Sequence, residues 1–336
     1  MQLEYPDKYM IISRTPFRIS FFGGGTDYPD WFKNYGGAVL STTFDKYCYI
    51  TCRELPPFFE HKYRIAYSRV ENAKDLNDIE HPAVRAVLGE LGIEKGLEIH
   101  VDADLPARSG LGSSSSFTVG LLNALTALQG RRVSQEWLAR EAIRIEQEVI
   151  RENVGSQDQT AAAYGGFNVI RFLRDGGLKI DPVIVPLERK RQLNDHLMLF
   201  FTGFSRIASE IAKSKVANLA ARTQDLHKMR QMVDDALDIL TTDKDIRYFG
   251  ELMHASWMCK RSLSEKVSNR DIDCIYETAR KHGAIGGKLL GAGGGGFMLL
   301  FVEREKQIDV RNSLRHLVYA PFQFEVGGSQ VVYYQP

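Results

Sequence analysis

The spacing of hydrophobic positions changes abruptly within the first half of the chain. Residues 97–101 alternate apolar and polar side chains, as expected for a strand with one buried face. Downstream, apolar residues recur at helical spacing on one face: Phe117, Leu121, Leu122, Leu125 and Leu128. Residues 106–116 (PARSGLGSSSS) separate the two patterns and are mostly small. The pattern predicts a strand, a glycine- and serine-rich loop, and a helix.

Several other segments of the first half have the composition of strands. Residues 10–22 are predicted as a strand that Pro16 interrupts. Further strands are expected at residues 38–44, 47–52, 62–67 and 167–172. Cys48 and Cys52 are four positions apart in an apolar, β-branched run, so we expect two core thiols on one strand face.

Helices are predicted between these strands. One is expected at residues 81–91, and a longer one follows Ser134 as N-cap. The apolar stripe of the longer helix comprises Leu138, Ala142, Ile145 and Val149. A third helix begins near Gly155, where Ser156 and Gln159 have the spacing of a capping box.

The second half is more helical. A strand at residues 197–201 leads into a helical region over residues 206–281, with a break at residues 241–243. Strands are then expected at residues 284–290, 297–302, 322–326 and 330–334. The pattern is interrupted around residues 175–195. We therefore predict an α+β protein with two domains, residues 1–185 and 186–336.

Composition excludes several classes of function. The chain has 336 residues, 44% of them hydrophobic, which suggests about two globular domains. Its 43 Lys and Arg against 42 Asp and Glu leave a net charge of +1, so no global field attracts nucleic acid or a membrane surface. We see no targeting segment at the N-terminus and no apolar run of the roughly 20 residues that span a bilayer. We expect a cytoplasmic protein without nucleic-acid or membrane partners.

The loop at residues 106–116 has the chemistry of a phosphate-binding loop. Small residues that lead into a helix N-terminus offer backbone N–H groups and the positive end of the helix dipole to an anion. The serines Ser113–Ser116 add hydroxyl groups. An ordinary turn before a helix has the same composition, so the loop alone leaves both interpretations open.

Two further segments are rich in glycine, at residues 23–25 and 291–296. The second matches G-x-G-x-x-G, but it leads into a predicted strand, whereas a dinucleotide fingerprint opens a helix. A Walker loop is excluded because Leu289 follows Gly287-Lys288. Residues 291–296 are therefore either a plain hairpin loop or a loop that packs closely against a ligand or another loop.

Two carboxylates stand out. Glu146 falls on the apolar stripe of its helix, where a carboxylate is costly unless it is paired or binds a metal. Asp158 lies in the first turn of the next helix, where it either complements the helix dipole or assists an acceptor hydroxyl in phosphoryl transfer. A serine hydroxyl, Glu146 and nucleotide phosphates would suit Mg²⁺. Together with the glycine segments, these residues suggest an ATP-dependent kinase.

Three motifs, in this order, resemble those of the GHMP kinase superfamily, which includes galactokinase, homoserine kinase and mevalonate kinase. They are Pro16-x-Arg18 with Gly23-Gly24-Gly25-Thr26-Asp27, Pro106-x3-Gly110-Leu111-Gly112-Ser113-Ser114, and Lys288-Leu-Leu-Gly291-Ala-Gly293-Gly294-Gly295-Gly296. The resemblance covers nearly the whole chain, and the segment Gly155-x-x-Asp158-Gln159 is similar to the catalytic stretch of the family's sugar kinases. It implies a ribosomal protein S5 domain 2-like N-terminal domain and a ferredoxin-like C-terminal domain.

The resemblance also implies roles for individual residues. Asp158 would be the catalytic carboxylate, assisted by Arg18, and Ser114 with Glu146 would bind Mg²⁺. ATP would be bound by one loop, comprising Pro106, Ser109, Gly110, Leu111, Gly112, Ser113, Ser114 and Ser115. The acceptor would contact residues from three segments: Gly24, Gly25, Thr26, Asp27, Arg206, Gly294 and Gly295. We expect partners limited to ATP and a small-molecule sugar; the sequence does not indicate the oligomeric state.

The acceptor is indicated by the form of the first motif. Galactokinases have Glu-His where this chain has Gly24-Gly25, whereas GGGTD is similar to the kinases of D-glycero-D-manno-heptose 7-phosphate and to fucokinase domains. Those enzymes phosphorylate the anomeric hydroxyl ahead of nucleotide-sugar synthesis. Residues 202–206 also look like that subgroup, and Arg206 would reach a sugar phosphate or be a solvated arginine. Alternatives are a fucokinase or other sugar 1-kinase, a homoserine or isoprenoid kinase, and a non-catalytic sugar or nucleotide sensor.

Overall fold

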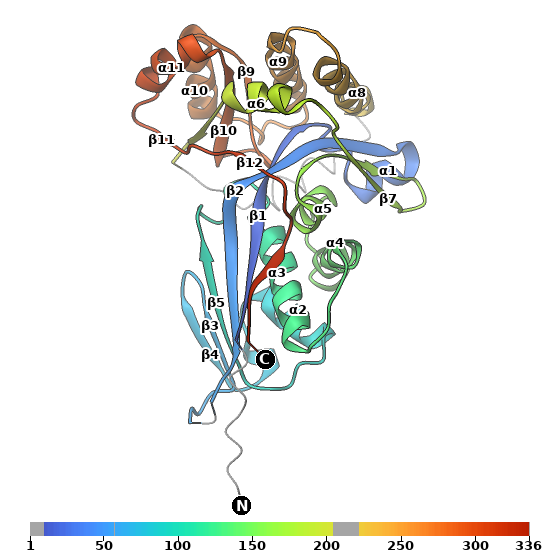
Figure 1. Ribbon diagram of the computed structural model, residues 1–336, viewed down its shortest axis with the longest axis vertical. Helices are drawn as coiled ribbons and strands as arrows, with labels where there is room; N and C mark the ends of the chain where they lie inside the picture. The colour runs from blue at the N-terminus through green and yellow to red at the C-terminus, as the bar shows by residue number, and fades with distance from the viewer. Residues whose placement is uncertain (1–9, 57, 204–221, 336) are drawn as a thin grey trace, which may run out of the picture.

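The long strand β2 (Gly37–Glu54) is the spine of the larger of two lobes (Figure 1). The computed structural model describes residues 10–56, 58–203 and 222–335. Along β2, β1 (Met10–Phe22) pairs on one side, while β6 (Phe167–Phe172) and β5 (Leu97–Ala103) share the other. The path of the nine-stranded sheet is β13-β1-β2-β5-β3-β4. The remaining strands are β3 (Tyr63–Ala66), β4 (Val70–Ala73), β7 (Leu178–Pro182), β12 (Phe324–Glu325) and β13 (Gln330–Gln335).

Two of the predicted strand breaks are absent. The segments expected at residues 38–44 and 47–52 form one strand, β2, because pairing with β1 continues through both. Pro16 does not end β1 either: the register shifts between Pro16 and Phe17, and this β-bulge accommodates a residue without an N–H donor. A second shift follows Ser20.

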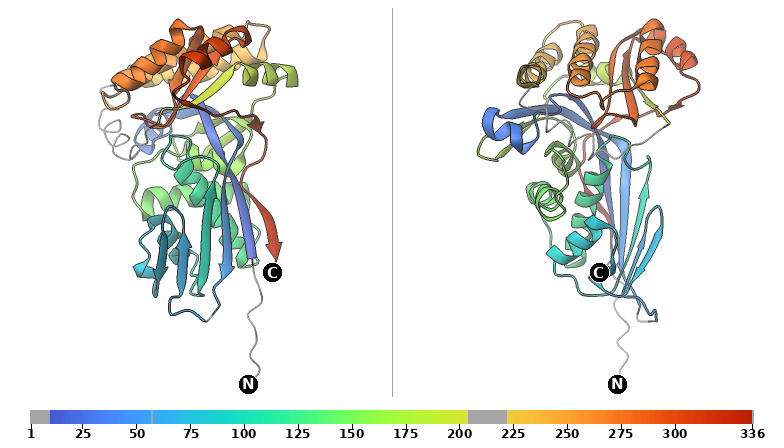
Figure 2. Two further views of the ribbon diagram at one scale, coloured as in Figure 1. Left: turned by 90° about the vertical axis from the view of Figure 1, so that its left-hand side faces the viewer. Right: turned by 180° about the vertical axis from the view of Figure 1, so that it is seen from behind.

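One face of the large sheet is covered by helices (Figure 2). They are α2 (Pro82–Glu90), α3 (Ser113–Leu128), α4 (Gln135–Arg144) and α5 (Gln157–Tyr164), and α1 (Pro29–Tyr35) lies beside the upper end of the sheet. The helix α3 packs directly on β1, where a Cβ on Gly120 would lie 2.8 Å from Thr15 Oγ1. Ser134 caps α4 as predicted, accepting a hydrogen bond from Trp137 N–H at 3.1 Å.

The smaller lobe is an antiparallel sheet with strand order β11-β8-β10-β9 and its own helices. Its strands are β8 (Leu197–Phe201), β9 (Ala284–Leu289), β10 (Phe297–Val302) and β11 (Val318–Tyr319). Its helices are α6 (Leu187–Asp195), α8 (Thr223–Thr241), α9 (Arg247–Ser262), α10 (Arg270–Lys281) and α11 (Gln307–Ser313). The two-lobed α+β architecture is confirmed, and α8 ends at the predicted break.

The last strands of the chain return to the larger lobe. β12 pairs with β2 and β13 pairs with β1, so the C-terminal residues complete the first sheet. The division at residue 185/186 stays a prediction, and a cut there would separate these strands from their partners. Within the described ranges, no helix has both the length and the apolar character needed to cross a membrane.

Two glycine loops hold the lobes together by backbone contact. The β9–β10 loop (residues 290–296) packs on the β5–α3 loop (residues 104–112), and Phe297 N–H donates to Ser109 O at 3.2 Å. A Cβ on Gly291 would lie 2.4 Å from Gly110 Cα, and one on Gly296 would lie 2.1 Å from Ser109 O. Lys288 Nζ adds a bond to Phe21 O in β1 at 2.7 Å.

Replacing Gly291 with alanine tests this packing. Gly291 has φ +72°, so alanine carries both left-handed strain and a clash with backbone. We expect Gly291→Ala to lower the free energy of unfolding by roughly 3 kcal/mol or more in urea denaturation. Gly176→Ala is the matched control, because Gly176 has φ +87° with open space around it and should lose only about 1–2 kcal/mol. Equal losses in the two variants would contradict the packing argument.

Candidate active site

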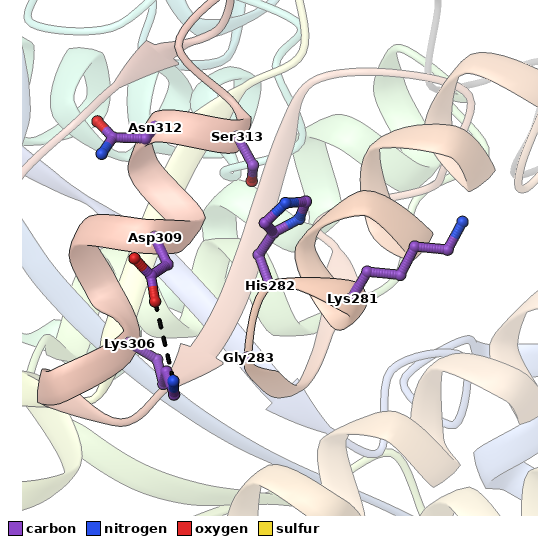
Figure 3. A pocket seen from close by; sticks show the side chains of 7 residues that line it. All are labelled: Lys281, His282, Gly283, Lys306, Asp309, Asn312 and Ser313. Carbon is purple, nitrogen blue, oxygen red and sulfur yellow. Dashed lines mark ion pairs between the residues drawn. The ribbon is translucent and has the colours of Figure 1, made fainter.

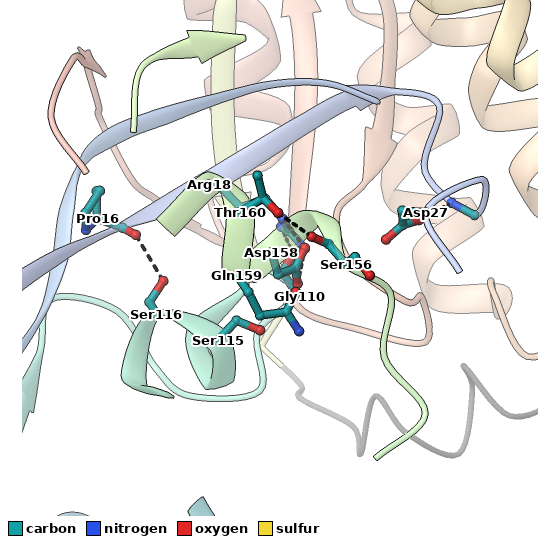
Figure 4. A network of polar contacts seen from close by, with 12 residues as sticks. Pro16, Arg18, Asp27, Gly110, Ser115, Ser116, Ser156, Asp158, Gln159 and Thr160 are labelled. Atoms are coloured by element: carbon teal, nitrogen blue, oxygen red, sulfur yellow. Dashed lines mark hydrogen bonds and ion pairs between the residues drawn. The ribbon is translucent and has the colours of Figure 1, made fainter. Parts of the chain in front are cut away.

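The guanidinium of Arg18 joins a carboxylate to the β5–α3 loop (Figure 4). Its Nε and Nη2 donate to the two carboxylate oxygens of Asp158, each at 2.8 Å. Its third nitrogen, Nη1, donates to Gly110 O at 2.8 Å. The Arg18 side chain is 4% exposed and that of Asp158 is 28% exposed. The paired geometry fixes the carboxylate in orientation while leaving it partly accessible.

Backbone geometry brings these groups together. Arg18 N–H donates to Leu111 O at 3.1 Å, which ties β1 to the loop. Gly112 caps α3 in the left-handed conformation, with φ 77°. A Cβ at this position would lie 3.2 Å from Arg18 Cγ and 3.4 Å from Asp158 Cγ. Glycine therefore both permits the turn and admits the pair.

The N-terminus of α3 lies beside this pair and has the chemistry that suits an anion. Its first N–H groups, from Ser113 to Ser115, have no partner within the helix and carry the positive end of the dipole. Within the loop, Arg108 N–H donates to Ser113 Oγ at 3.0 Å. Ser109 and Leu111 are buried, whereas Pro106 is exposed. The loop thus places small residues and backbone N–H groups at a helix N-terminus, and its role in phosphate binding stays a prediction.

Glu146 lies beneath the loop, 1% exposed. Ser115 Oγ donates to Glu146 Oε2 at 2.9 Å, and Gln159 Nε2 donates to the same oxygen. Burial raises the pKa of the Glu146 carboxyl to about 7, although hydrogen bonds from Thr118, Ser115 and Gln159 oppose the increase. An acid of this kind changes charge easily near neutral pH, and a bound cation would favour its ionised form.

A π-helical turn (Ile145–Val149) presents Glu146 to the loop. The wider turn shifts the positions that follow it around the helix axis. Val149 is therefore 37% exposed, and the expected apolar stripe ends before it. The predicted capping box is also wrong: Ser156 makes no side-chain cap and instead accepts from Gln147 Nε2, while Gln159 reaches Glu146.

Asp27 forms the opposite side of the site. Its carboxylate accepts from Gly25 N–H at 2.9 Å, and its own carbonyl accepts from Ser156 N–H at 3.0 Å. A Cβ on Gly155 would lie 1.8 Å from Asp27 Oδ2, so only glycine allows this approach. Burial raises the pKa of Asp27, and the negative charge of Asp158 raises it further. The carboxyl groups of Asp27 and Asp158 are therefore close enough to interact electrostatically.

Unpartnered polar atoms concentrate here. Five of the eleven buried side-chain polar atoms without a hydrogen-bond partner in the described part of the chain belong to this site. They are Ser20 Oγ, Ser109 Oγ, Glu146 Oε1, Gln157 Oε1 and Gln159 Oε1. Because a buried unpaired polar atom costs about 1–3 kcal/mol, such a concentration indicates a site built for ligands.

The residues near Glu146 fit a magnesium ion held together with nucleotide phosphates. The unpartnered Oε1 is a hard oxygen ligand at the N-terminus of α3, and hydroxyl groups surround it. Across the described residues, no three His, Cys, Asp or Glu side chains gather as a metal cluster. A metal here would therefore take most of its ligands from phosphate and water, as Mg²⁺ commonly does.

Several predicted residues have other positions than expected. Ser114 is exposed, and Ser115 is the serine that contacts Glu146. The Thr26 hydroxyl is buried and donates within its own turn, to Gly23 O and Ala38 O. Gly294 N–H donates to Val267 O, and Gly295 is buried. Arg206 lies outside the described residues.

Some supporting residues gave no sequence signal. Lys260 in α9 is buried and donates to Leu289 O and Gly291 O, at 2.7 and 2.6 Å, which anchors the start of the β9–β10 loop. Gln159 was expected as a helix cap and within the segment similar to the catalytic stretch, and Ser115 within the ATP-binding loop, but neither was expected to contact Glu146. Contacts from residues this far away in sequence depend on tertiary packing, which spacing does not encode.

A separate hollow lies in the smaller lobe between α10 and α11 (Figure 3). Its volume is about 550 Å³, and Lys281, His282 and Lys306 are among its lining residues. Lys306 Nζ lies 3.9 Å from Asp309 Oδ2, across one helical turn. The hollow shares no lining residue with the network around Arg18, so we do not assign it to the same site.

The pKa of Glu146 gives a prediction for stability. Because this pKa is raised from 4.5 to about 7, the folded state keeps a proton that the unfolded chain releases in this range. Glu146 should therefore contribute a fall in the free energy of unfolding as pH rises from 4.5 to 7, of roughly 3 kcal/mol at most. Glu146→Gln should remove this component of the slope in urea titrations with EDTA. The exposed neighbour gives the control, Glu148→Gln, which should keep it; parallel curves for wild type and Glu146→Gln would refute the assignment.

Comparisons with known proteins agree with this geometry. The model of the GHMP kinases N terminal domain matches residues 77–166, and that of the GHMP kinases C terminal matches residues 235–320. The D-glycero-alpha-D-manno-heptose 7-phosphate kinase of Campylobacter jejuni is 29% identical over 91% of this chain and 93% of its own. The galactokinase of Pyrococcus furiosus is 26% identical, covering 94% and 95%.

Solved structures give the same result. A D-glycero-D-manno-heptose 1-phosphate kinase from Bacteroides thetaiotaomicron superimposes with a TM-score of 0.79 at 25% identity, covering 96% of this chain and 99% of its own. Both lobes match, and the two family models together span more than half of the sequence. The chain belongs to the GHMP kinases.

Proposed function

We propose that this GHMP kinase transfers the γ-phosphate of ATP to the anomeric hydroxyl of a sugar, with D-glycero-D-manno-heptose 7-phosphate as acceptor and the 1,7-bisphosphate as product. The observation that carries the phosphotransfer role is the Arg18 clamp, which holds Asp158 at the mouth of the β5–α3 loop. Relatives along nearly the whole chain are named as sugar kinases, which supports the acceptor class.

The loop and the start of α3 would bind the phosphates of ATP. Gly110, Gly112 and the N–H groups of Ser113–Ser115 offer donors without bulky side chains, and Ser109 Oγ is buried without a partner. Glu146 with a neighbouring serine hydroxyl, Ser115 or Ser114, would hold Mg²⁺. When bound, Mg²⁺ supplies neutralisation of phosphate charge.

Asp158 would face the acceptor hydroxyl. The acceptor oxygen forms a bond to the γ-phosphorus, the bond from that phosphorus to the β,γ-bridging oxygen breaks, and the hydroxyl proton passes to Asp158. Arg18 keeps the carboxylate in place and adds a fixed positive charge beside it. Catalysis would rest on positioning and charge, because the protein forms no covalent bond to the phosphoryl group.

Fucokinase is the second candidate. The bifunctional fucokinase/GDP-fucose pyrophosphorylase of Arabidopsis thaliana is 26% identical over 96% of this chain, which spans 33% of that longer protein.

The Asp158–Arg18 pair also argues for catalysis over a sensor role, since a sensor would not need a clamped carboxylate beside the phosphate loop.

An acceptor panel tests the proposal. Purified protein with Mg-ATP should release ADP fastest with D-glycero-D-manno-heptose 7-phosphate, by about tenfold or more over fucose and galactose in kcat/KM, and mevalonate should be inert. Phosphorus NMR of the product should show a new anomeric phosphate. Faster turnover of fucose would favour the second candidate, and turnover of mevalonate would overturn the sugar-kinase proposal.

A further inference from the structure

Two of the unpartnered polar atoms lie apart from the phosphate loop, on the acceptor side. Ser20 Oγ projects from β1 next to its second register shift, and Gln157 Oε1 belongs to the first residue of α5. Ser20 is 6% exposed. Neither atom has a role in the phosphotransfer described above, so their lack of partners needs its own explanation.

Gly24 lies between these side chains. A Cβ on Gly24 would be 3.8 Å from Ser20 Oγ and 3.8 Å from Gln157 Nε2, with no closer heavy atom. Both polar groups therefore border one small space above the Gly24 backbone. A ligand group of hydroxyl size would meet both side chains there.

The Gln157 amide borders this space through its nitrogen. Gln157 Nε2 is the atom 3.8 Å from the Cβ position of Gly24, and Oε1 of the same amide is buried without a partner. The amide therefore offers a donor toward the space. Ser20 Oγ can donate or accept.

The charges of the surroundings limit what this space would bind. The Asp158 carboxylate places negative charge near it, and burial together with that charge raises the pKa of the neighbouring Asp27 carboxyl. A phosphate or carboxylate would be repelled here. A neutral hydroxyl could accept from Gln157 Nε2 and donate to Ser20 Oγ, so that the buried serine oxygen gains a partner.

We propose that Ser20, Gln157 and the bare Gly24 backbone form a subsite for one non-reacting hydroxyl group of the sugar acceptor, and that this subsite selects among acceptors. The inference rests on the proposed sugar-kinase function. It adds the residues that would bind a sugar hydroxyl other than the one that is phosphorylated. A phosphate group on the acceptor would have to bind elsewhere. Ser20 and Gln157 are binding residues in this scheme, because they touch the substrate but not the transferred group.

The test compares Ser20→Ala with wild type on the acceptor that turns over and on its monodeoxy analogues. Wild type should lose at least about 100-fold in kcat/KM with one particular analogue, the one that lacks the bound hydroxyl. Ser20→Ala should lose about tenfold or more with the parent sugar, but match wild type within about threefold on that analogue. The KM for ATP should not change.

Two further variants complete the design. Ser256→Ala removes another buried, unpartnered serine hydroxyl, in α9, and should leave acceptor selectivity unchanged. Gly24→Ala places a methyl group in the space at ordinary contact distances, so it should fold but raise KM for the sugar about tenfold or more.

The outcomes separate the two proposals. If wild type phosphorylates a sugar while Ser20→Ala loses nothing, or loses equally with every deoxy analogue, the subsite is wrong and the sugar-kinase function stands. If wild type phosphorylates no sugar at all, the proposed function fails first.

Discussion

The site depends on the hydrogen bonds that the Arg18 guanidinium donates. One planar group binds both oxygens of Asp158 and the carbonyl of Gly110, so the carboxylate and the phosphate loop cannot move independently. A lysine offers a point charge and could not make this set of contacts in one plane. The buried position of Arg18 in β1, next to a bulge beside Pro16, makes the strand itself the reference for the geometry.

Close backbone approach is the second constraint. Gly112 admits the Arg18–Asp158 pair, Gly155 admits Asp27, and Gly291 admits Gly110. At each point a Cβ would crowd a neighbour, and Gly112 and Gly291 also have the positive φ that favours glycine. Lys260 fixes the β9–β10 loop by donating to Gly291 O within it and to Leu289 O at the end of β9. The site is thus assembled from four segments far apart in sequence, at the junction of the two lobes.

Much of this could be predicted from the sequence. The alternation at residues 97–101 and the stripe after Phe117 located β5 and α3, and the strands at residues 167–172 and 197–201 were predicted with their observed bounds. Glu146 was identified because a carboxylate on an apolar stripe needs a partner. Its partner was not identifiable: which of four consecutive serines meets it depends on the rotation of α3 and on a π-helical turn that breaks the 3.6-residue period.

The remaining differences have similar causes. Thr26 was expected to contact the acceptor, but its hydroxyl is buried and hydrogen-bonds to the carbonyl oxygens of Gly23 and Ala38. Strand continuity through residues 45–46 and the return of β13 to β1 are set by pairing between distant segments. Local spacing indicates which side chains of a helix or strand point into the core. Pairing between distant segments decides which residues those side chains contact.

The most direct test of the Arg18 clamp is a double-mutant cycle on kcat/KM, with Arg18→Met, Asp158→Asn and the double variant, and with nucleotide affinity measured alongside. If the clamp makes the two residues one unit, each single variant should lose about a thousandfold or more, and the double variant should be little worse than Asp158→Asn. Nucleotide affinity should weaken in Arg18→Met and not in Asp158→Asn, because only Arg18 holds Gly110. Losses that multiply in the double variant would contradict the account.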